Sequence, residues 1–124
     1  MAAPNIVAVA TITGKTTYTS LTTTSVTSVL SNAASSNKVF KVNSVIVSNI
    51  DGTNAVNFTL SYNTAAAGAG TNVEMVSTIS VPANATLIAL DKSTSIYLEE
   101  NTSLTATAGT ASKLKVTISY EDIS

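Results

Sequence analysis

The chain has 124 residues, a net charge of −1 and only 10% charged side chains, and it contains no cysteine, histidine, tryptophan or arginine. These absences exclude a disulfide framework, remove most nucleophile–base pairs and metal-ligand sets, and leave no guanidinium group to read phosphates or bases. We therefore expect a single domain over residues 1–124 that binds no nucleic acid and no cofactor and is not an enzyme.

The first thirty residues carry the weakest strand signal. We expect a strand over 6–13, a tight hairpin turn at Gly14 and Lys15, and a returning strand over 16–21. The stretch 22–30, which is rich in threonine and serine, alternates poorly between polar and apolar residues. Residues 1–30 are therefore interpreted as containing an edge strand or an extended arm.

The next segment, residues 39–49, is predicted to be a long strand. Its alternation changes phase near Asn43 and Ser44, and an extra residue at that point, a β-bulge, explains the change. Asp51 and Gly52 then form a turn signal, because both residue types favour turn conformations. The strand therefore ends before residue 51.

The second half of the chain contains the clearest alternation. Residues 56–62 and 114–120 alternate strictly between apolar and polar side chains, which is typical of strands with one buried and one wet face. The same period at Val73, Met75, Ile79 and Val81 predicts another strand with one wet face, followed by a turn at 82–84. The glycine-containing stretch 65–71 is predicted to be a mobile loop.

Two segments, 45–47 and 87–90, are apolar on both faces. A two-sheet sandwich buries only one face of each strand, so either a partner chain covers the other face or these are central strands beneath a loop. The first alternative predicts self-association, as a trimer, through 87–90. It also predicts a protein interface at Val45, Val47, Leu87, Ile88 and Leu90.

Many short strands separated by turn residues, without a helical period, predict an all-β fold: a single-domain β-sandwich of the jelly-roll type. Roughly three residues in ten are serine or threonine, which predicts strands whose outer faces carry hydroxyl groups. No run approaches the roughly 20 apolar residues of a membrane span. No positive charge precedes the apolar N-terminal stretch, so we expect no signal peptide.

Seven carboxylates are the main candidates for chemistry. Glu99 and Glu100 would point to opposite faces of a strand, so a polar turn is favoured over a paired acid site and the weak hydrolase that such a site would imply. Glu121 and Asp122 are predicted to lie in a solvated C-terminal tail. No loop carries the spaced acidic ligands of a calcium site, so no metal is predicted.

The four tyrosines, Tyr18, Tyr62, Tyr97 and Tyr120, suggest a stacking platform for sugars. Tyr62 and Tyr120 fall in phase with core positions, which favours packing for these two. A glycan-binding or host-receptor-binding module is therefore an alternative function, supported by the hydroxyl-rich faces.

Several short sequence segments occur in a distinctive order along nearly the whole chain. They are Met-Ala-Ala-Pro-Asn-Ile-Val at the start, Ala-Thr-Ile-Thr-Gly-Lys at 10–15, Lys-Val-Phe-Lys-Val-Asn-Ser at 38–44, Val-Ser-Asn-Ile-Asp-Gly at 47–52, Thr-Ile-Ser-Val-Pro-Ala at 78–83, Ile-Tyr-Leu-Glu-Glu at 96–100 and Ile-Ser-Tyr-Glu-Asp-Ile-Ser at the end. Together they resemble small virion proteins of tailed bacteriophages, especially those that infect marine cyanobacteria. The chain departs from them at Asn101 and Thr102, where we expect Gly-Asp, and in a longer loop at 65–72.

The resemblance implies a virion protein that is synthesised in the host cytoplasm and has no catalytic residues. A head-decoration or cement protein on the outer capsid would have the major capsid protein as its main partner. A neck, tail or fibre-associated protein is an alternative within the same resemblance. No contact with nucleic acid or membrane is expected.

Overall fold

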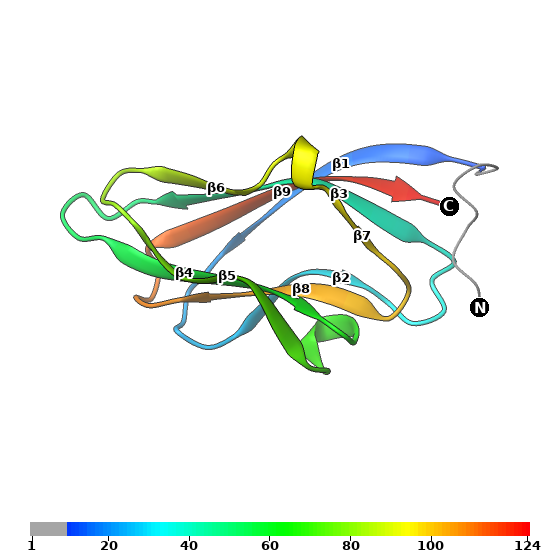
Figure 1. The fold of residues 1–124 in the computed structure, drawn as a ribbon, viewed down its shortest axis with the longest axis horizontal. Helices are drawn as coiled ribbons and strands as arrows, with labels where there is room; N and C mark the ends of the chain where they lie inside the picture. Colours follow the sequence, from blue (N-terminus) through cyan, green and yellow to red (C-terminus); the bar gives the residue numbers. More distant parts are fainter. Residues whose placement is uncertain (1–9) are drawn as a thin grey trace.

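The computed structural model describes residues 10–124, and this part of the chain contains β-strands and two short 3-10 turns but no α-helix. The strands form two antiparallel sheets that pack face to face, drawn one above the other in Figure 1. The predicted all-β sandwich is therefore confirmed.

The five-stranded sheet contains β1 (Ile12–Ser20), β9 (Leu114–Ile123), β3 (Val39–Asn49), β6 (Thr86–Leu90) and β7 (Ile96–Leu98), in the order β1-β9-β3, with both β6 and β7 paired to β3. The four-stranded sheet has the order β2 (Thr27–Asn32), β8 (Thr102–Ala108), β4 (Val56–Asn63) and β5 (Asn72–Val81). The 3-10 turn η1 (Ala66–Gly68) follows β4, and η2 (Lys92–Thr94) separates β6 from β7. Only β4–β5 and β6–β7 are consecutive strands of one sheet, so the chain repeatedly crosses between the layers.

The core consists of the alternate side chains that each strand directs between the sheets. Phe58 and Leu60 of β4 are completely buried in the same core cluster as Val116 and Ile118 of β9. Thr117, between the last two, is only partly buried. The alternation predicted for 56–62 and 114–120 therefore marks the buried faces correctly. Each such side chain contributes roughly 1.5–3 kcal/mol when it is removed from water.

A register shift between Val42 and Ser44 confirms the bulge predicted in β3. The extra residue, Asn43, changes the phase of the strand at this point. As a result Val42 before the bulge and Val45 and Val47 after it all point into the core, where they are completely buried. A regular strand of this sequence would direct one of the two groups to solvent.

The N-terminal prediction is wrong at Gly14 and Lys15. Both lie inside β1, which pairs with β9 from Ile12 to Ser20 without interruption, so no hairpin turn forms there. The continuous partner strand β9 overrides the local turn signal. Residues 6–9 of the predicted first strand lie outside the described residues. β1 and β2 are edge strands of different sheets, and residues 21–26 connect them.

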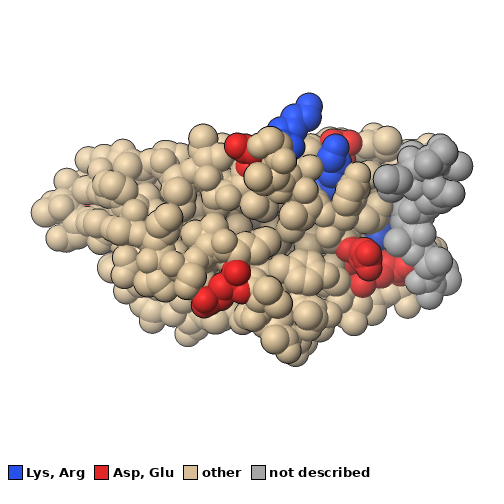
Figure 2. Space-filling model, in the orientation of Figure 1, with Lys and Arg blue, Asp and Glu red and all other residues tan. Residues whose placement is uncertain are grey.

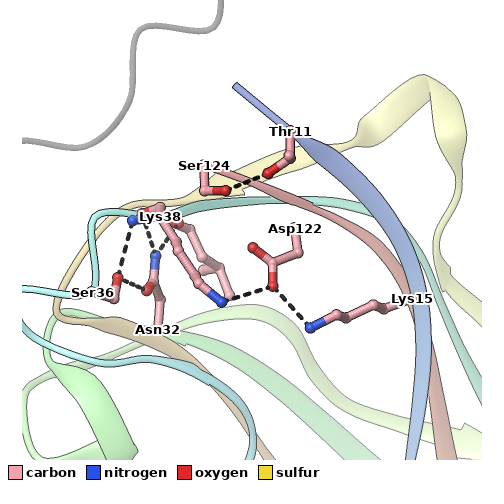
Figure 3. Close-up of polar contacts among 8 residues, drawn as sticks. Thr11, Lys15, Asn32, Ser36, Lys38, Asp122 and Ser124 are labelled. Atoms are coloured by element: carbon pink, nitrogen blue, oxygen red, sulfur yellow. Dashed lines mark hydrogen bonds and ion pairs between the residues drawn. The ribbon is translucent and has the colours of Figure 1, made fainter. Parts of the chain in front are cut away.

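The predicted C-terminal tail is also wrong, because Glu121 and Asp122 lie in β9 between β1 and β3. The Asp122 side chain is buried, and its Oδ2 accepts hydrogen bonds from Nζ of Lys15 at 2.9 Å and of Lys38 at 3.2 Å (Figure 3). Burial raises the pKa of the Asp122 carboxyl, but the two lysines outweigh this effect, and the pKa lies below its ordinary value.

Candidate interaction surface

The carboxylates do not gather into a site in the described part of the chain. No three of the acidic residues in 10–124 lie close enough together to hold a metal ion. Glu99 and Glu100 lie between β7 and β8, where Oε2 of Glu100 accepts a hydrogen bond from the backbone N–H of Asn37 at 3.2 Å. No helix within these residues is long and apolar enough to cross a membrane.

The structure corrects the predicted interface. Val45 and Val47 are completely buried, Leu90 is buried beside them, and Leu87 is partly buried against the same core. Only Ile88, with 63% of its surface exposed, faces solvent. The bulge in β3 and the pairing of β3 with β6 direct the other four side chains between the sheets, so these four cannot offer an open surface to another chain.

Ile46 is the exposed residue that the prediction omits. Directly opposed residues of antiparallel strands share a face, and the registers place Tyr18, Thr117, Ile46 and Ile88 in one line across β1, β9, β3 and β6. Tyr18 is 75% exposed and Ile46 is 37% exposed. We call these four residues the outer apolar row, because they lie on the solvent face of the five-stranded sheet.

Hydroxyl side chains flank the outer apolar row on both sides. The flanking positions given by the same registers are Thr16, Ser119 and Ser44 on one side, and Ser20, Lys115, Ser48 and Thr86 on the other. Lys115, whose Nζ donates to Oγ of Ser20 at 2.9 Å, is the only charged residue among them. Figure 2 views the two sheets edge-on, and charged side chains are also few on this side of the molecule. A surface with few charges loses little solvation energy when a partner covers it.

The outer face of the four-stranded sheet is different, because residues 64–71 fold back over it. We call residues 64–71 the covering segment. Ser103 and Thr105 of β8 point away from the core, yet both are buried beneath it. Oγ of Ser103 donates to the carbonyl of Ala65 at 2.7 Å and accepts from the N–H of Gly68 at 3.1 Å. The hydroxyls of this face therefore bond to the chain itself.

Asn63, at the end of β4, holds the base of the covering segment. Its Oδ1 accepts hydrogen bonds from the N–H groups of Ala65 at 3.0 Å and Gly70 at 2.8 Å. Its Nδ2 donates to the carbonyl of Gly70 at 3.2 Å and to Oδ1 of Asn72 at 2.8 Å. The loop predicted to be mobile at 65–71 is instead fixed to the sheet by side-chain hydrogen bonds.

The four tyrosines do not share a stacking surface. Tyr62 and Tyr120 pack against the core, and the ring of Tyr120 lies 5.1 Å from that of Phe40, centre to centre. Tyr18 and Tyr97 are exposed, but they lie on β1 and β7, which are on opposite sides of the β9–β3 pair. A sugar ring cannot stack on both at once.

Comparison with known proteins gives no match to a protein-family model and no significant similarity to a curated protein. The evidence on function therefore comes from the structure itself, and above all from the outer faces of the two sheets. One is covered by the chain itself, and the other carries exposed apolar side chains. The second face is the candidate interaction surface.

Proposed function

We propose that the protein is a non-enzymatic structural protein of a bacteriophage virion, which decorates or cements the head by binding the major capsid protein on the outer capsid. The observation that carries this proposal is the outer apolar row, in which Tyr18, Ile46 and Ile88 are exposed between rows of hydroxyl groups. The assignment to a bacteriophage is supported by the ordered sequence segments that resemble small virion proteins.

The outer apolar row suits a protein that binds in many copies. Burial of its side chains contributes roughly 25 cal/mol for each Å² of apolar surface removed from water. The flanking hydroxyl groups are able to donate and accept hydrogen bonds and so tolerate a partner of varied polarity. Symmetry repeats one modest contact over the whole capsid, so each copy needs little affinity of its own.

We also infer that the sandwich is a jelly roll. When β6 and β7 are counted as one strand interrupted by η2, each sheet has four strands, in the orders β1-β9-β3-β6/β7 and β2-β8-β4-β5. Eight strands that alternate between two sheets in this way support a jelly-roll connectivity, which viral capsid proteins also use. The protein is made in the host cytoplasm, works in the virion, and contacts neither nucleic acid nor a membrane.

The copy number in purified virions tests where the protein acts. Quantitative mass spectrometry of particles of the encoding phage should find hundreds of copies per virion. A count of a few copies per particle would contradict a head-decoration role and would favour the neck or tail.

Capsid binding by variants tests the surface itself. Ile46→Ser combined with Ile88→Ser should abolish co-sedimentation of the purified protein with capsids that lack it. The matched control is Val73→Ser combined with Ile79→Ser, which removes two comparably exposed apolar side chains from β5 of the other sheet. Equal loss of binding in both double variants, or in neither, would overturn the assignment of this face.

A further inference from the structure

Three of the four lateral sheet edges carry features that hinder the addition of another strand. At the edge formed by β6 and β7 the strands are short and η2 separates them. The edge strand β2 has a register shift after Ser28, and β5 has two, near a left-handed Thr78 with φ of 49°. Bulges and short strands are the usual means by which proteins protect exposed edges.

The fourth edge, β1, has none of these features. Its nine residues pair with β9 without a register shift, it contains no proline, and no strand within residues 10–124 pairs with its other side. Its only charged residue is Lys15, whose ammonium group is bonded to the buried Asp122. A long, regular edge is a template for another strand. Lys15 is the one feature of β1 that works against pairing, and its ion pair with Asp122 reduces this effect.

The backbone hydrogen bonds between β1 and β9 show which residues of β1 have N–H and C=O groups directed away from β9. Thr11 exchanges two backbone hydrogen bonds with Ser124, and the N–H of Leu21 donates to the carbonyl of Leu114. In a regular antiparallel ladder the residues that bond to the partner alternate, so the odd-numbered residues of β1 bond to β9. The even-numbered residues, from Ile12 to Ser20, therefore direct their N–H and C=O groups to the free edge.

We propose that β1 pairs antiparallel with β1 of a second copy of this chain, about a twofold axis at Thr16. Pairs of even-numbered residues then exchange the hydrogen bonds: Thr16 with Thr16, Gly14 with Tyr18, and Ile12 with Ser20 of the other copy. The two five-stranded sheets join into one ten-stranded sheet. All nine residues of each β1 take part.

The side chains favour this register. A Cβ at Gly14 would have open space around it, and Tyr18 is the most exposed of the large side chains on β1. Opposed across the axis, the tyrosine ring covers the bare glycine backbone, a pairing that stabilises edge glycines. A register centred on Lys15 would place two like charges directly opposite each other, which is unfavourable. A register centred on Thr17 would leave Ile12 and Thr13 unpaired.

This dimer replaces the trimer expected from 87–90, because the structure turns Leu87 and Leu90 toward the core. It does not require the proposed capsid binding, although the two share Tyr18, and it can be tested without a virion. An interface made by one pair of edges falls below the roughly 800 Å² per partner of a standard stable complex. The dimer should therefore depend strongly on protein concentration.

Cysteine cross-linking tests the register, and the natural chain contains no cysteine that would interfere. Two Cα atoms in a hydrogen-bonded antiparallel pair lie about 5.5 Å apart, which permits a disulfide. Thr16→Cys should therefore form an intermolecular disulfide at least about tenfold faster than Thr13→Cys, because the pairing raises the effective concentration only at the axis. In the proposed dimer the two copies of residue 13 lie roughly 20 Å apart. Equal rates for the two variants would overturn the proposal.

A charge variant tests the interface without covalent trapping. Thr16→Lys places two ammonium groups together at the axis, while in a monomer the side chain at this exposed position points into water. Sedimentation equilibrium at high concentration should find the wild type dimeric and Thr16→Lys monomeric, with circular dichroism confirming the fold. Ser80→Lys, on the β5 edge, is the control and should remain dimeric. A monomeric wild type, or a dimeric Thr16→Lys, would refute the pairing.

Discussion

The outer faces of the two sheets have similar local sequences but differ in which side chains are exposed to solvent. On the four-stranded sheet, the hydroxyls of Ser103 and Thr105 are buried beneath the covering segment. On the five-stranded sheet, Ile46 and Ile88 are exposed, and no described segment covers them. The polar residues are thus inside and the apolar ones outside, which is the reverse of what hydropathy alone would assign.

The needs of the backbone explain this reversal. A loop that lies on a sheet must find hydrogen-bond partners for its own N–H and C=O groups. Ser103 and Asn63 supply such partners to Ala65, Gly68 and Gly70. Ile46 and Ile88 offer no hydrogen bonds, so the same loop would leave its polar groups unsatisfied over them. An apolar face is better covered by the side chains of another protein.

The largest expected effect comes from detaching the covering segment. Asn63→Ala removes four hydrogen bonds from a completely buried side chain and should lower the free energy of unfolding by about 3 kcal/mol. Urea denaturation measures the loss, and hydrogen exchange should show faster exchange of the amides in 64–71. Asn57→Ala, at an exposed position of the same strand, is the control. A stability equal to that of Asn57→Ala would contradict the anchoring role of Asn63.

Gly70 in the covering segment and Gly14 in β1, an edge strand of the five-stranded sheet, give the next comparison. A Cβ on Gly70 would lie 2.8 Å from the backbone nitrogen of Ala65, whereas a Cβ on Gly14 would meet nothing within 4 Å. Gly70→Ala should therefore cost about 2 kcal/mol through displacement of the covering segment. Gly14→Ala should raise stability by about 0.5 kcal/mol, because alanine has less conformational freedom to lose on folding. Thermal denaturation of both at low concentration measures the difference, and a neutral Gly70→Ala would show that the segment is loosely attached.

The regular strands and the bulge could be predicted from sequence, because alternation and its change of phase at Asn43 are local patterns. The exposure of Ile46 could not, since it depends on which residues β6 and β9 place beside it. The covering segment was equally hidden: its alanines and glycines resemble a free loop, and its anchors, Asn63 and Ser103, are forty residues apart. The sequence alone predicts a tail at Asp122, because its partners, Lys15 and Lys38, are distant along the chain.

The charge cluster that ties β1 to its sheet should give a smaller, pH-dependent effect. Asp122→Asn should lower the free energy of unfolding by about 1 kcal/mol at pH 7, a modest value because both lysines are more than one-third exposed. The folded-state pKa of Asp122 is lowered, so its contribution is present above the ordinary pKa near 3.9 and is lost as the pH falls through the lower folded value. Urea denaturation from pH 2 to 7 should show wild type and variant converging below about pH 4. A constant difference down to pH 2 would exclude the carboxylate as its source.

The smallest expected effect is the sharpest test of the contrast between the faces. Ile88→Ser exchanges an apolar for a polar side chain at a position that is 63% exposed, and it should cost about 0.5 kcal/mol in the isolated monomer. Thr105→Val makes the opposite exchange and retains the side-chain shape, yet it should cost about 1 kcal/mol, because Oγ1 of Thr105 donates to Oδ1 of Asn72 at 2.7 Å beneath the covering segment. Denaturant titration of both variants against the wild type compares the two losses. If Ile88→Ser proved the more damaging, Ile88 would belong to the folded core and the outer apolar row would lose one of its three exposed members.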